Sequence, residues 1–187
     1  MKTRSTLTLL CACLLMTTAM AHELPANRVA LVLRDDTHVS LTAFIDYTEA
    51  LHQTLAPQQT QQEFLLQYST LKPSDFRAAA VQAHALWREG LRLTLATGEP
   101  LAARQWQWPD PERIQASLKA RAMNLLTGGD GHDQIGVDEI HAEATVAKKI
   151  GSLSVALPQQ WGRVLVVSYR PRQAWKEPGS APLEVGF

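Results

Sequence analysis

Three histidines have the residue type and spacing that could hold a metal ion. His22 follows Ala19-Met20-Ala21, a small-x-small sequence of the kind that signal peptidase cleaves. A chain that begins at His22 offers its free α-amine and its imidazole to one ion, and such nitrogen ligands favour Cu(II). We expect His38 and His141 as its partners, and His52 is also available. The competing interpretation, which we favour, is that His22 is tolerated after the cleavage site and the others are ordinary core or surface residues.

Two further groups combine carboxylates with a histidine. Glu139, His141 and Glu143 alternate along one predicted strand, so they share a face and could serve acid–base chemistry. The polar outer face of any sheet has the same pattern, and we prefer that interpretation. The stretch GGDGHDQIG at 128–136 could gather two aspartates and a histidine around a cation. Its spacing is not that of an EF-hand, so we expect a solvated loop.

The motifs of the common enzyme classes are missing from the sequence. It contains no G-x-S-x-G, H-E-x-x-H, phosphate-loop or dinucleotide-binding motif. Ser168 stands in VVSYRP without the glycines of a nucleophile turn, which favours a plain strand residue. We therefore predict no catalytic residue and favour a non-enzymatic protein, with a hydrolase of unrecognised site as the remaining alternative.

The segment SYRPRQAWKEP, residues 168–178, joins arginine and aromatic side chains near proline turns. Such side chains dominate the hot spots of interfaces, so the segment could be a docking edge for a protein partner. The alternative is a structural corner held by cation–π contacts, and the sequence leaves both open. The predicted partner-binding residues are Tyr169, Arg170, Arg172 and Trp175.

The first 21 residues have the features of an export signal. Lys2 and Arg4 precede an apolar run, and the small-x-small site follows it. The alternatives are an uncleaved anchor and a lipoprotein attached through Cys13, which ends the near-lipobox LCAC. Cleavage before His22 would remove 21 of the 187 residues and both cysteines, leaving 166 residues with 16 basic and 18 acidic side chains. We expect a periplasmic domain, and the absence of any block of like charge argues against nucleic acid as a partner.

The elements that must position these residues begin with the hairpin at 28–47. Apolar side chains alternate on both sides of a short polar turn, the pattern of two strands with one buried face. Helices are predicted over 48–55, from Pro57, over 73–90 and from Asp110-Pro111, and strands over 91–96, 101–108, 137–147, 152–157 and 163–170. Consecutive apolar residues at 164–167 predict a strand buried on both faces. The predicted core includes Val29, Leu31, Leu41, Ile45 and Val166, and Leu125 joins the predicted buried stripe of the last helix.

About seven strands in antiparallel-looking pairs, without sustained strand–helix alternation, predict one α+β domain over residues 22–187. The specific expectation is an immunoglobulin-like antiparallel β-sandwich with helical insertions. The stretches AHELPANRVALVLRD, HVSLTAFIDYTEALH and VVSYRPRQAW resemble a group of uncharacterised secreted proteobacterial proteins expected beside HupE/UreJ-like membrane proteins of metal-permease type. That resemblance implies an exported protein with a membrane partner and supplies no catalytic residues.

An N-terminal histidine on a sandwich also looks like the copper-binding CopC-like proteins. The chain departs from their Asp-x-His pair, because Asp138 and His141 are one residue too far apart. This departure counts against copper. The sequence therefore favours a non-enzymatic periplasmic accessory or binding domain that acts with an inner-membrane protein, and a copper or other divalent-metal protein using His22 is the alternative.

Overall fold

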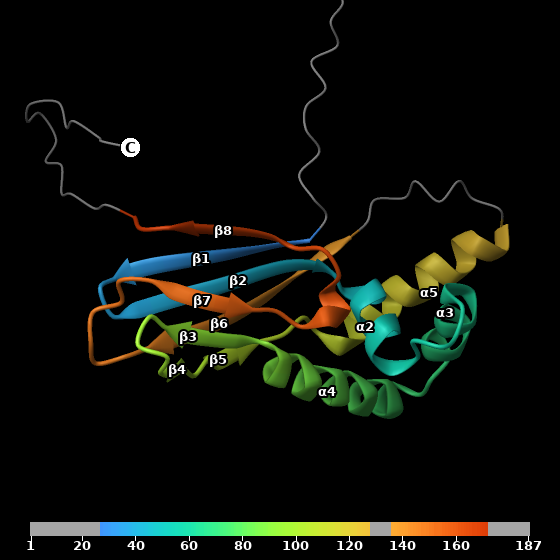
Figure 1. The fold of residues 1–187 in the computed structure, drawn as a ribbon. Helices are drawn as coiled ribbons and strands as arrows, with labels where there is room; N and C mark the ends of the chain where they lie inside the picture. The colour runs from blue at the N-terminus through green and yellow to red at the C-terminus, as the bar shows by residue number, and fades with distance from the viewer. Residues whose placement is uncertain (1–26, 128–135, 172–187) are drawn as a thin grey trace, which may run out of the picture.

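The hairpin predicted from the sequence lies in the middle of the larger of two β-sheets (Figure 1). The computed structural model describes residues 27–127 and 136–171. The hairpin strands pair antiparallel with Leu31 opposite Leu41, and the predicted turn is closed by the Thr37 amide, which donates to Asp35 Oδ1 at 2.8 Å. The strands of this sheet lie in the order β5-β6-β2-β1-β8 and are β1 (Arg28–Asp35), β2 (His38–Asp46), β5 (Arg104–Gln107), β6 (Val137–Thr145) and β8 (Leu165–Tyr169).

The smaller sheet covers part of the apolar face of the larger one. It has the order β4-β3-β7, with β3 at Arg92–Leu95, β4 at Pro100–Leu101 and β7 at Leu153–Ala156. Residues from both sheets join one core, among them Leu41 and Leu93. The architecture is therefore α+β, with two sheets rich in antiparallel pairs that do not close into a barrel.

The single strand predicted over 101–108 is wrong, because this segment changes sheets. Its first residues belong to β4 in the smaller sheet, and 104–107 form β5 at the edge of the larger one. Gln105 has a φ of +52°, a backbone conformation that is uncommon for residues other than glycine. A period-two pattern continues through such a corner, so it could not show the change of sheet.

In the described residues, four α-helices gather at one end of the two sheets (Figure 1). The first two begin at polar caps: Asp46 accepts a hydrogen bond from the Glu49 amide, and Thr60 forms a capping box with Glu63. The predicted start at Asp110-Pro111 is confirmed, but Leu125 is exposed and lies outside the buried stripe. The helices are α2 (Tyr47–Leu55), α3 (Gln61–Ser69), α4 (Pro73–Gly90) and α5 (Pro111–Thr127), with a 3₁₀ turn, η2, at Gln159–Trp161.

The strand β8 differs most from its prediction. It pairs with β1 in a parallel register, with Val29 beside Val166, instead of in the predicted antiparallel manner. All five of its residues are exposed, so the prediction that Val166 is core is wrong, whereas Val29, Leu31, Leu41 and Ile45 are buried as predicted. A run of consecutive apolar residues marks a strand but does not distinguish a central strand from an edge strand. Within 27–127 and 136–171, no helix has the length and apolar character needed to cross a membrane.

Candidate docking groove

Two of the histidines predicted as metal ligands, His38 and His141, lie on the outer face of the larger sheet, opposite the core. On β2, His38 Nε2 is 2.7 Å from Glu143 Oε2 of the neighbouring β6, and Ser40 Oγ donates to the other oxygen of the same carboxylate at 3.1 Å. This pair borders an open cleft of about 580 Å³ that Arg104 also lines. His38 is thus held by a carboxylate across the strand pair.

The second histidine forms a similar but separate group. His141 Nδ1 lies 3.2 Å from Thr42 Oγ1, and its Nε2 lies 3.1 Å from Glu139 Oε1. A hydroxyl, an imidazole and a carboxylate in this order are the parts of a nucleophilic site. Here, however, they stand on a sheet face where the His141 and Glu139 side chains are 39% and 49% exposed. We interpret them as cross-strand surface pairs.

The two histidines do not meet. The register places His141 opposite Thr42, four residues along β2 from His38, which corresponds to roughly 13 Å along the strand. Two imidazoles that share one ion each place a nitrogen about 2 Å from it. Among the residues that the structure describes, no cluster of three or more histidine, cysteine or acidic side chains could hold a metal ion. His22 lies outside these residues, so the three-histidine site stays a prediction.

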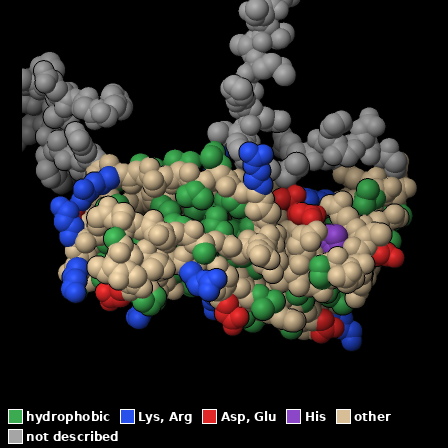
Figure 2. Space-filling model, viewed as in Figure 1, with side chains coloured by type: hydrophobic (Ala, Val, Ile, Leu, Met, Phe, Trp, Pro, Cys, Tyr) green, Lys and Arg blue, Asp and Glu red, His purple; other side chains and the backbone are tan. Residues whose placement is uncertain are grey.

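An apolar groove opens on the core side of the larger sheet, between β7 and β8. We call it the β7–β8 groove; it has a volume of about 560 Å³. Its floor is the inner face of β1 and β2, and its sides come from the segment before β7 and from the end of β8. Figure 2 shows hydrophobic side chains gathered in a hollow of this face. The apolar residues that line it are Leu31, Leu33, Val39, Ile150, Leu153 and Tyr169.

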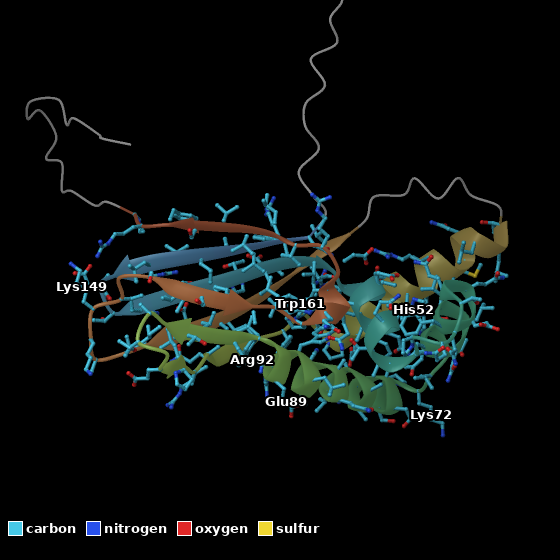
Figure 3. All side chains as sticks on the ribbon, viewed as in Figure 1. His52, Lys72, Glu89, Arg92, Lys149 and Trp161 are labelled. Carbon is cyan, nitrogen blue, oxygen red and sulfur yellow. The ribbon has the colours of Figure 1, made fainter. Side chains whose placement is uncertain are left out.

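Two basic side chains, Lys149 and Arg170, lie at one end of the groove and are held by the β1–β2 turn. Asp36 in the β1–β2 turn forms ion pairs with Lys149, at 3.0 Å, and with Arg170. The same turn accepts a backbone hydrogen bond from Ile150 at 2.7 Å, which ties the segment before β7 to the hairpin. Figure 3 places Lys149 at the end of the sheets far from His52 and the helices. Exposed ion pairs contribute at most about 1 kcal/mol, so both cations can turn to an acidic partner.

The structure brings together part of the predicted docking edge. Tyr169 and Arg170 both line the groove, and the Tyr169 residue is 53% exposed. Arg172 and Trp175 lie outside the described residues. Sequence reasoning missed the floor of the groove, because the alternation of β1 and β2 marks Leu33 and Val39 as inward-facing without showing which strands cover them.

The opposite end of the sheets is closed by aromatic packing. The Tyr47 hydroxyl pairs with His84 Nε2, and the His84 ring stacks on Trp108 with centroids 4.1 Å apart. Burial, aided by the neighbouring Arg88 guanidinium, lowers the pKa of His84 from 6.5 to about 4, and burial raises the pKa of Tyr47. His84 is only 7% exposed, so we assign this cluster a role in packing.

No protein family model, no curated protein and no solved structure matches this chain. The predicted relation to secreted proteins beside HupE/UreJ-like membrane proteins therefore stays a prediction. The β7–β8 groove and the exposed edge strand β8 are the features of the described residues that point to a function.

Proposed function

We propose that the protein is a non-enzymatic periplasmic binding domain that captures an extended segment of an inner-membrane protein in the β7–β8 groove. The observation that carries this proposal is the edge strand β8, which is apolar, five residues long and exposed throughout. An open strand edge presents unpaired backbone groups, and natural proteins usually shield it with charge, proline or a covering element. In the described residues β7 is also an edge strand and borders the groove floor, and extended peptides bind such edges by adding a strand.

The chemistry of the groove defines the segment that it would accept. The floor offers Leu31, Leu33 and Val39 to apolar side chains, and a strand presents such side chains at every second residue. Lys149 and Arg170 at one end favour an acidic residue near the end of the ligand, which would orient it. We also propose that the two sheets form an immunoglobulin-like sandwich. Their packing around one core supports this arrangement.

Position-specific photocrosslinking in living cells tests this function. A photoreactive residue at Ser168 or Tyr169, which line the groove on β8, should give an adduct with one inner-membrane protein. The matched controls are Val81 on α4 and Met123 on α5, which are also exposed but lie among the helices. The proposal predicts the adduct from the β8 positions only. An equal adduct from Val81 and Met123, or none from β8, would contradict it.

A further inference from the structure

The two sheets cover unequal widths, and this leaves room for one more strand. Among the residues that the structure describes, the larger sheet has five strands and the smaller has three. In the described part of the chain, β7 pairs with β3 on one side only, and its other edge borders the groove. A strand laid along that edge would extend the smaller sheet over the inner face of β1 and β8. It would give the β7 edge a hydrogen-bonded partner and shield the groove floor from water.

We propose that residues Leu183–Phe187 of the same chain occupy the β7–β8 groove as this additional strand. The sequence LEVGF alternates Leu183, Val185 and Phe187 with Glu184 and glycine, so one face would be apolar throughout. Three apolar side chains at every second position match a floor built from alternate residues of β1 and β2. Glu184 would point away from the floor into solvent.

The length of the connection permits this return. Residues 170–182 link the end of β8 to the segment and contain Pro171, Pro178 and Pro182. Thirteen residues reach at most about 40 Å, whereas a five-residue strand is roughly 17 Å long, so the chain can enter the groove from either end. The prolines disfavour a longer strand, and none follows Pro182 in the printed sequence.

A tethered strand would also regulate the site. A segment joined by a short linker has an effective concentration of about millimolar, so a partner must displace it before binding. This consequence rests on the proposed function. Occupation of the groove by 183–187 does not, because it needs only the groove and the segment.

Disulfide trapping tests the occupant directly. The only cysteines of the chain are Cys11 and Cys13, which serine can replace in the full-length protein. Ser168 lines the groove, whereas Val167, the residue before it, does not, because successive side chains of a strand point to opposite faces. Each test variant combines Ser168→Cys with a cysteine at position 183, 185 or 187. Its control carries the same tail cysteine together with Val167→Cys. Both are oxidised under the same mild conditions.

We expect at least one Ser168→Cys pair to give an intrachain disulfide at about tenfold the yield of its Val167→Cys control, because tethering at millimolar effective concentration favours the adjacent thiol. Equal yields, or no intrachain product from any of the three pairs, would overturn the proposal. If disulfides form only between two chains, the occupant of the groove is a second copy of the protein and not the tail of the same chain. Thermal melting checks that every variant is folded.

A chain ending at Pro182 separates this inference from the proposed function. Removing the tail should raise the partner adduct from Tyr169 severalfold while the melting temperature of the core changes little. If the disulfide to the tail forms but no adduct with a membrane protein is found, the tail occupies the groove and the proposed function is wrong. If the adduct forms but no disulfide to the tail is found, the proposed function stands and the tail is not the occupant.

Discussion

The two ends of the sheets show what happens to apolar surface with and without a cover. At the helical end, Trp87 is fully buried and packs edge-on against Tyr47, with centroids 5.1 Å apart. At the other end, β8 carries equally apolar residues, yet Val166 remains 44% exposed. The difference lies in the covering elements, since α2 and α4 close one end while the smaller sheet stops at β7. Surface that a fold leaves open in this way commonly marks a binding site.

The largest effect should come from opening the closed end. Trp87→Ala should lower the free energy of unfolding by about 3–5 kcal/mol, because it removes a fully buried ring and leaves a cavity. It also removes the indole donor to Thr54 Oγ1 at 2.8 Å. Urea unfolding measures the loss, and Trp87→Phe should retain part of the stability. A loss below about 1 kcal/mol, typical of a surface substitution, would show that this end is not the closed core.

Acid should weaken the same end through His84. Its pKa is about 4 in the folded protein against 6.5 for the unperturbed group, so the unfolded chain binds more protons between these values. Stability should therefore be fully present above pH 6.5 and fall by roughly 3 kcal/mol as the pH drops to 4. Carboxylates titrate nearby, so the measurement is the difference between the natural chain and His84→Phe. Identical pH profiles of the two proteins would contradict the assignment.

Substitutions in the predicted docking segment should weaken binding of the partner and leave the stability of the fold unchanged. Arg172→Ala combined with Trp175→Ala should weaken capture of the membrane partner by about 2 kcal/mol, roughly 30-fold, if these residues are interface hot spots. The yield of the Tyr169 photoadduct over a range of expression levels reports this change. Lys119→Ala on α5 removes a cation at the opposite end and serves as the control. If the yield of the photoadduct is unchanged, Arg172 and Trp175 do not belong to the docking surface.

A smaller effect is expected for Val166 on the edge strand β8. In a chain that ends at Pro182, Val166→Ala should cost less than about 1 kcal/mol of unfolding free energy, because the residue is 44% exposed. Leu41→Ala, on the same sheet but 1% exposed, should cost about 2–5 kcal/mol. Chemical denaturation of the two variants gives the comparison. Equal losses would mean that β8 is covered in solution.

The features predicted correctly from the sequence are those that depend on residues close together along the chain. The alternation around Leu31 and Leu41 located the hairpin and its buried face, and Asp110-Pro111 located the start of α5. Prediction failed where the outcome depends on distant strands, as with Val166, whose exposure follows from a smaller sheet that ends at β7. The groove could be predicted only in part for the same reason. Tyr169 and Arg170 are recognisable as hot-spot residue types, whereas Leu33 and Val39 become site residues only through the strands that fail to cover them.

The smallest effect should come from the outer-face histidines, and it separates docking from metal binding. His38 and His141 pair with different glutamates and lie four residues apart along the sheet, which disfavours their binding one ion together. We expect His38→Ala with His141→Ala to leave both the Tyr169 adduct and Cu(II) binding, measured by calorimetry on protein verified to begin at His22, unchanged. One residue added ahead of His22 should likewise leave the adduct unchanged, because the groove is lined by residues of β1, β2, β8 and the segment before β7. Copper binding tighter than micromolar that disappears on this extension would favour the metal function, since the extension removes the free α-amine from His22.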